Sequence, residues 1–85
     1  GTTAGTVGKA VAMSDRRMKK NIFVIGQSDS GLNIYTFEYK NPKEFGEGTY
    51  QGVMSDEIPT EAVITGEDGF DRVNYDLIDV EFKQL

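Results

Sequence analysis

Alternating apolar and polar residues mark the clearest predicted strand, at residues 32–40. Tyr35, Phe37 and Tyr39 share one face of that strand, because successive side chains of a strand point to opposite faces. Asn41-Pro42 ends the pattern, since proline cannot donate a hydrogen bond to a neighbouring strand. Tyrosines at this spacing usually lie in a core or an interface rather than in a ligand site, so we expect this face to be buried.

The rest of the chain predicts shorter elements. Ser55 is a good helix cap followed by two acidic residues, and Pro59 limits that helix to about one turn. Turn-forming residues separate the other apolar stretches. We therefore expect an α+β fold, a small mixed domain of antiparallel strands and short helices, with strands near 32–40, 49–54, 62–65 and 70–75, helices near 16–22 and 55–58, a turn at 26–31, a charged loop at 43–48 and a hairpin loop at 66–69.

Two segments remain ambiguous. The apolar run from Ile22 to Ile25 fits a helix end or a buried strand, and periodicity does not separate the two. In the tail from Asp76 to Leu85, apolar residues alternate with charged ones, which favours a strand. Asp76 as a cap, followed by apolar residues at helical spacing, favours a helix near 77–84.

Composition predicts one small domain with a thin core. The chain has 85 residues, a formal net charge of -5 and neither cysteine nor histidine, so it lacks disulfides and the usual zinc ligands. Small domains without such links often gain stability by oligomerising. We expect no membrane association, because no apolar run approaches roughly 20 residues. The small, glycine-rich residues 1–13 are expected to form a linker or the end of an upstream stalk, and a start at Gly1 indicates a fragment or a processed product.

The most unusual stretch runs from Met13 to Ile22. It places four cations in five residues of an acidic chain, with Ser14 just upstream. A serine–lysine pair can activate a hydroxyl without histidine, provided that burial and neighbouring cations lower the lysine pKa from about 10.4. Ser14 and Lys19 are five residues apart and cannot share a face of one helix or strand. If they meet, Ser14 lies in a turn before the element that holds Lys19, or the two come from different subunits.

Two other interpretations of this stretch stay open. Ser14 or Asp15 could cap a helix with a solvated basic turn. The cations Arg16, Arg17, Lys19 and Lys20 could instead contact a phosphate or a nucleic acid, although the acidic balance makes nucleic acid an unexpected partner. Asp56 and Glu57 could resemble a metal or acid–base pair, but the sequence offers them no further ligand. We expect no metal and no cofactor.

Several segments in register carry a resemblance to the intramolecular chaperone domain of phage endosialidases, the peptidase S74 family. Ser14-Asp15-Arg16-Arg17-Met18-Lys19-Lys20-Asn21-Ile22 resembles its opening signature, Ser-Asp-x-Arg-Leu-Lys-x-Asn-Ile. The later matches are the segments 31–40, 52–58, 59–63 and 73–75, in the family's order. The resemblance covers residues 14 to about 78, so it implies a short variant of that domain at 14–85. Asp56 stands where glutamine is common in the family.

The resemblance implies a function. Such domains form homotrimers at the C-terminus of tailspikes and tail fibres, help the upstream stalk of their own chain to fold, and then cut themselves off before the motif serine. Here it implies a single-turnover autoproteolytic serine endopeptidase with the dyad Ser14 and Lys19 and the cleavage site Met13–Ser14, in a virion protein assembled in the host cytoplasm. The alternative is a non-cleaving trimeric cap or knob of the same fold, retained in the virion.

A mechanism for the implied cleavage follows from covalent geometry. The Ser14 hydroxyl can attack the Met13 carbonyl carbon through a five-membered ring and form an ester, which water then hydrolyses. Lys19 would take the hydroxyl proton and return it to the leaving amine. We expect backbone N–H groups to hold the oxyanion, and the sequence does not identify them.

Overall fold

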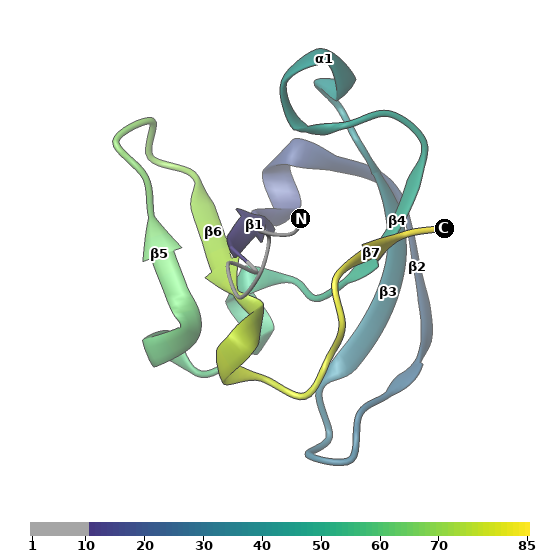
Figure 1. Cartoon of the computed structure of the whole chain (residues 1–85), viewed down its shortest axis with the longest axis vertical. Helices are drawn as coiled ribbons and strands as arrows, with labels where there is room; N and C mark the ends of the chain where they lie inside the picture. Colours follow the sequence, from purple (N-terminus) through teal and green to yellow (C-terminus); the bar gives the residue numbers. More distant parts are fainter. Residues whose placement is uncertain (1–10) are drawn as a thin grey trace, which may run out of the picture.

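The computed structural model describes residues 11–85 as two antiparallel sheets joined by short helical turns (Figure 1). The four-stranded sheet has the order β2-β3-β4-β7, and the three-stranded sheet has the order β1-β6-β5. The elements are β1 (Val11–Met13), η1 (Arg16–Met18), β2 (Lys19–Gln27), β3 (Asn33–Tyr39), α1 (Pro42–Phe45), β4 (Thr49–Gly52), η2 (Ser55–Glu57), η3 (Thr60–Ala62), β5 (Val63–Thr65), β6 (Asp71–Asn74), η4 (Tyr75–Leu77) and β7 (Lys83–Gln84). This is the expected small mixed domain of mostly antiparallel strands with few short helices.

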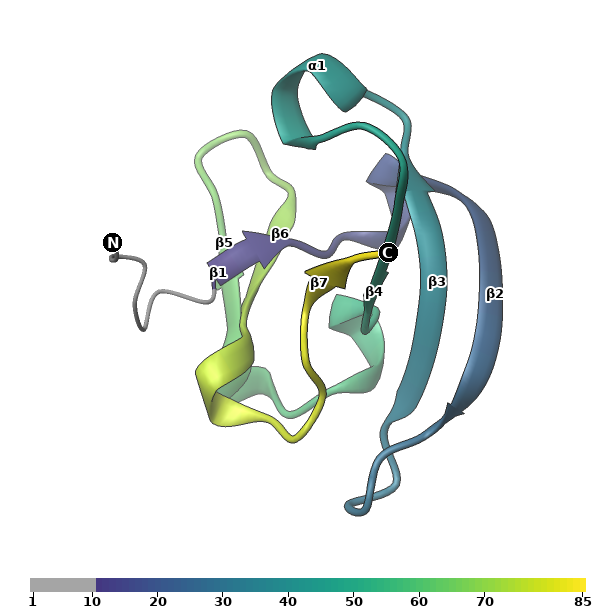
Figure 2. The ribbon, with the colours of Figure 1, turned by 45° about the vertical axis from the view of Figure 1, so that its right-hand side comes forward.

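The two sheets lie on opposite sides of the molecule (Figure 2), and residues from both contribute to the core. The aromatic face of β3 is buried as its alternation predicts, with Tyr35, Phe37 and Tyr39 all at most 9% exposed. Met13 from β1 packs into the same cluster, which connects the end of β1 to the four-stranded sheet. Met13, the first residue of the unusual stretch from Met13 to Ile22, is therefore part of the core.

Several predicted elements are confirmed. The hairpin around residues 66–69 forms between β5 and β6, with Val63 opposite Val73. The helix expected at 55–58 is a single 3-10 turn, η2. The turn between β2 and β3 closes with a hydrogen bond from the Ser28 N–H to the Leu32 carbonyl. In these segments the local sequence and the tertiary environment favour the same structure.

Two predictions are wrong, and one of the two alternatives for the tail is not observed. The helix expected at 16–22 ends at Met18 as a 3-10 turn, because Lys19 enters β2 and pairs with Tyr39 of β3. The loop expected at 43–48 contains one helical turn, α1, started by Pro42, whose fixed φ suits a first helical position. No helix forms at 77–84, where η4 is followed by an extended segment and by β7, which pairs with β4.

The ambiguous run from Ile22 to Ile25 is a strand, but it is not the buried strand that was considered. It belongs to β2, the outermost strand of its sheet, and its pairing with β3 contains two register shifts. Phe23, Val24 and Ile25 are each more than half exposed, at 65%, 60% and 54%. An outermost strand also presents unpaired backbone groups, so β2 offers an open, apolar edge.

Residues 1–13 were expected to be a linker or the end of a stalk. Their last three residues form β1, which pairs with β6 through Met13 opposite Arg72, and residues 1–10 lie outside the described part of the chain. Within residues 11–85, no helix is long and apolar enough to cross a membrane.

Candidate active site

Ser14 is fully buried at the point where β1 ends. Its backbone N–H donates to the Asp71 carbonyl and its own carbonyl accepts from the Ser55 N–H, both at 3.0 Å. Its hydroxyl lies 2.7 Å from the Tyr75 hydroxyl. The peptide and the side chain of Ser14 are thus both held in place, in the irregular residues between β1 and η1 and outside the strand that holds Lys19.

Asp15, not Ser14, provides the cap. Its carboxylate accepts from the Arg17 N–H at the start of η1, from the Arg17 guanidinium and from the Asp71 N–H. The Arg17 guanidinium is the main reason why the pKa of Asp15 lies well below its usual range, and the Asp71 N–H adds to the effect. The capping interpretation is therefore confirmed for Asp15, and the cap leaves the Ser14 hydroxyl available for another role.

Lys19 is the first residue of β2 and is only 2% exposed. Its Nζ donates to the Val53 carbonyl at 2.7 Å and lies 3.7 Å from the centre of the Phe37 ring. The pKa of Lys19 is lowered to about 7, mainly by burial and also by the charge of Arg16, while the carboxylates of Asp15 and Asp56 oppose the shift. The aromatic face of Phe37 favours the ammonium form, but this attraction is small beside the cost of burying a charge.

Asn21 explains how the strand can begin with an inward lysine. Its φ of 51° lies in the left-handed region, which asparagine tolerates better than most residues. The pairing with β3 shifts register between Lys20 and Phe23, directly around this residue. The Asn21 side chain donates to Glu38 on β3, which holds the irregular segment against the sheet.

Ser14 and Lys19 are connected through other groups. Among the hydrogen bonds of residues 11–85, none joins them directly. The Val53 backbone connects them, since its carbonyl accepts from the Lys19 amine and its N–H donates at 3.1 Å to the Tyr75 hydroxyl, which bonds to the Ser14 hydroxyl. Gly52 makes this arrangement possible, because a Cβ at that position would collide with the Tyr75 hydroxyl. The absence of a side chain at Gly52 thus lets the Tyr75 hydroxyl reach the backbone of the site.

The carbonyl of Met13, which belongs to the peptide bond before Ser14, accepts a hydrogen bond from the Tyr39 hydroxyl at 2.6 Å. Tyr39 lies opposite Lys19 in the pairing of β2 with β3. Burial raises the pKa of Tyr39, so the phenol keeps its proton and acts as a donor. At this oxygen, where backbone N–H donors were expected, a side-chain hydroxyl donates.

Most of the basic cluster is engaged within the domain. Arg16 forms ion pairs with Asp56 and Glu57, which were considered as a metal or acid–base pair. Arg17 forms an ion pair with Asp15, and Lys19 is buried. Among residues 11–85, no group of three or more histidine, cysteine or acidic side chains could hold a metal ion.

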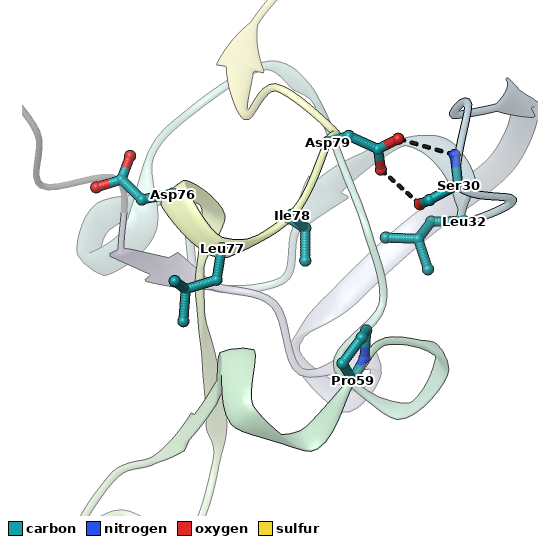
Figure 3. A pocket seen from close by; sticks show the side chains of 7 residues that line it. All are labelled: Ser30, Leu32, Pro59, Asp76, Leu77, Ile78 and Asp79. Atoms are coloured by element: carbon teal, nitrogen blue, oxygen red, sulfur yellow. Dashed lines mark hydrogen bonds between the residues drawn. The ribbon is translucent and has the colours of Figure 1, made fainter.

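Two hollows mark the described surface. A polar one of about 230 Å³ is lined by Asp15, Arg16, Arg17, Ser55, Asp56 and Asp71, so it adjoins the residues that hold the Ser14 peptide. A larger one of about 540 Å³ lies beside η4 and shares none of these residues (Figure 3). There Asp79 accepts from the N–H and the hydroxyl of Ser30, so these polar groups satisfy one another.

Sequence reasoning found Ser14, Lys19 and Met13 but missed Tyr39 and Tyr75. Their hydroxyls contact Met13 and Ser14, which are 26 and 61 residues away in the chain. For Tyr39, a tyrosine rather than a phenylalanine on a buried strand face was the available signal, because a buried hydroxyl needs a partner.

Comparison with family models, with curated proteins and with solved structures finds no match to this chain.

Proposed function

We propose that this domain is a self-cleaving trimerisation chaperone that cuts its own chain at Met13–Ser14 with Ser14 as nucleophile and Lys19 as general base. The observation that carries the proposal is the buried Lys19 amine, whose pKa near 7 lets about half of it be neutral at neutral pH. The Lys19 amine is buried within the domain, as are the Ser14 hydroxyl and the Met13 carbonyl. A lysine with no chemical role would more easily leave its charge in water.

The first step forms a bond between the Ser14 Oγ and the Met13 carbonyl carbon. The hydroxyl proton passes to the neutral Lys19 amine, and the carbonyl electron pair moves onto the Met13 oxygen. When this pair returns, the bond to the Ser14 nitrogen breaks, and that nitrogen takes the proton back from Lys19. For the transfers, the Lys19 Nζ must turn from the Val53 carbonyl toward Ser14.

The second step is hydrolysis of the resulting ester. Water adds to the ester carbonyl and gives a proton to Lys19, and the proton then goes to the departing Ser14 Oγ. The products are a Met13 carboxylate and a chain that begins at Ser14. The polar hollow beside Asp15 and Ser55 offers water a path to this peptide.

The resemblance of residues 14–78 supports the wider role. A domain of this kind would trimerise the stalk of a tail fibre, tailspike or related virion protein during assembly in the host cytoplasm and then be released. The competing anion or nucleic-acid role is less well supported, because Arg16 and Arg17 are paired with carboxylates and Lys19 is buried. A phosphate would have to displace these carboxylates.

A second candidate is the non-cleaving trimeric cap of the same fold. One observation favours it: the Ser14 hydroxyl bonds to Tyr75 and the Lys19 amine bonds to the Val53 carbonyl, rather than to each other. In that case the buried polar groups would only fix the geometry of the core.

Intact mass separates the two candidates. We expect the wild-type chain, refolded as a verified trimer, to yield a fragment that begins at Ser14. The rate should rise about tenfold per pH unit below neutrality and level off above about pH 7, because it follows the neutral fraction of Lys19. A chain that stays intact after prolonged incubation as a trimer would leave the non-cleaving cap as the function.

Trimer assembly would cover the open edge of β2. Phe23, Val24 and Ile25 are more exposed than apolar side chains usually are in a lone domain, and β2 is an outermost strand. A copy of the same chain is the occupant that fits the proposed homotrimer, since β2 could bury this run against it.

We expect the double variant Phe23→Lys, Ile25→Lys to be a monomer in sedimentation at micromolar concentration, because six added cations would face one another in the trimer. Ile64→Lys is the matched control. It places one added cation per chain, half the charge of the double variant, on β5, the exposed outer strand of the other sheet, and should remain trimeric. A double variant that sediments like the wild-type trimer would contradict the proposed use of this edge.

A further inference from the structure

We infer that Tyr39 is a catalytic residue that stabilises the oxyanion formed on the Met13 carbonyl oxygen. The inference rests on the proposed cleavage at Met13–Ser14 and adds the electrophilic component that the Ser14–Lys19 pair lacks. Its basis is the 2.6 Å hydrogen bond from the Tyr39 hydroxyl to that oxygen, inside the core. No motif in the sequence assigns this role to Tyr39.

The Tyr39 hydroxyl donates to the oxygen atom whose charge changes during the reaction. When the Ser14 Oγ adds to the carbonyl carbon, the Met13 oxygen gains a full negative charge. A hydrogen bond to an ionised acceptor is roughly twice as strong as one between neutral groups, and exclusion of water strengthens it further. The Tyr39 bond therefore stabilises the tetrahedral intermediate more than the starting peptide, which is the condition for accelerating the reaction.

The phenol is rigidly positioned before any reaction occurs. The Tyr39 ring packs against Phe37, Phe45 and Tyr50, with ring centres 5.3–5.6 Å away. Its backbone pairs with Lys19 at the end of the β2–β3 ladder. Donors fixed in this way need no reorganisation as charge develops, which is the usual origin of oxyanion stabilisation.

The scissile peptide is also fixed from its other side. The Ser14 N–H donates to the Asp71 carbonyl at 3.0 Å while Tyr39 donates to the Met13 oxygen. These two bonds define the plane of the peptide that Ser14 attacks. Tyr75 holds the attacking hydroxyl, so the three groups that must react are each held by a different element.

The alternative is a purely structural role, in which Tyr39 is an ordinary core tyrosine whose hydroxyl donates to the nearest carbonyl. Cleavage rates separate the two. Full-length chains made in denaturant are refolded at about pH 5.5, where protonated Lys19 keeps the reaction slow, then brought to about pH 8 and followed by intact mass. Folding of every variant is verified by circular dichroism before the pH change.

Tyr39→Phe keeps the ring and removes the donor, and it should slow cleavage about 10²–10³-fold. Tyr50→Phe is the matched control, because it makes the same change in a ring 5.3 Å away and should cleave at nearly the wild-type rate. A folded Tyr39→Phe variant that cleaves as fast as Tyr50→Phe overturns the role of Tyr39 alone. A wild-type chain that stays intact overturns the proposed protease function and this role together.

If Tyr39→Phe fails to fold, a second substitution tests the catalytic role of Tyr39. Replacing Tyr39 with 3,5-difluorotyrosine nearly preserves its size but makes the phenol a stronger donor. Burial raises the pKa of the Tyr39 phenol, and we expect the same burial to keep the analogue protonated at the working pH. We expect cleavage to become several-fold faster with the analogue at position 39 and to be unchanged with the analogue at position 50. An unchanged rate at position 39 overturns the inference.

Discussion

Ser14→Ala abolishes cleavage at Met13–Ser14 and leaves the domain folded and assembled, if the proposed mechanism is correct. The change removes the nucleophile, and the remaining groups cannot form the ester. Ser14 is fully buried and not a surface cap, so the structural cost comes from its hydrogen bond with Tyr75. Tyr75 still accepts from the Val53 N–H, and the cost should be about 1 kcal/mol.

Ser55→Ala is the matched control for this variant. Ser55 is also buried, donates its hydroxyl to Asp71 and lies next to Ser14 through its backbone. It should lose similar stability but cleave fully, as measured by intact mass. A fragment that begins at residue 14 in the Ser14→Ala chain would disprove the role of the hydroxyl.

Lys19→Met and Lys19→Arg should both stop cleavage but change stability in opposite directions. Methionine removes the general base and fits the apolar surroundings, and replacing a buried ionic group in this way is often neutral or stabilising. Arginine cannot lose its proton and is larger, so it places a permanent charge where Lys19 is 2% exposed. We expect Lys19→Arg to lose about 3 kcal/mol or more in urea unfolding.

The pH dependence of stability identifies the buried amine directly. Because the folded pKa of Lys19 is about 7 and the unfolded one is near 10.5, the unfolded chain binds more protons between these values. Stability therefore rises with pH in this window, by about 2 kcal/mol per protomer from about pH 7 to about pH 9. Above about pH 10 the trend should reverse, since burial raises the pKa values of Tyr39 and Tyr75 and favours their protonated, folded forms.

The measurement uses Ser14→Ala as background, so that the chain stays intact. Adding Lys19→Met should flatten the rise between about pH 7 and about pH 9, because the titrating group is gone. An equal rise with and without Lys19 would show that the amine is not buried as the structure has it, and would remove the support for its role as a base.

The sequence alone determined the parts of the fold in which one pattern dominates. The alternation of Tyr35, Phe37 and Tyr39 predicts the buried face of β3, since an alternating face has only one apolar side to bury. Strong turn residues likewise predict the β5–β6 hairpin. Ser14 and Lys19 were identifiable as candidates from their chemistry, because few residue pairs can activate a hydroxyl without histidine.

Only the tertiary structure decided the rest. Residues 22–25 and 76–85 each fit two patterns, and pairing with β3 and with β4 makes strands of Lys19–Gln27 and Lys83–Gln84. The lowered pKa of Lys19 depends on burial, which neighbours in the chain cannot provide. In the sequence, Tyr39 and Tyr75 cannot be distinguished from ordinary core tyrosines. Only the packing of distant segments brings their hydroxyls to Met13 and Ser14.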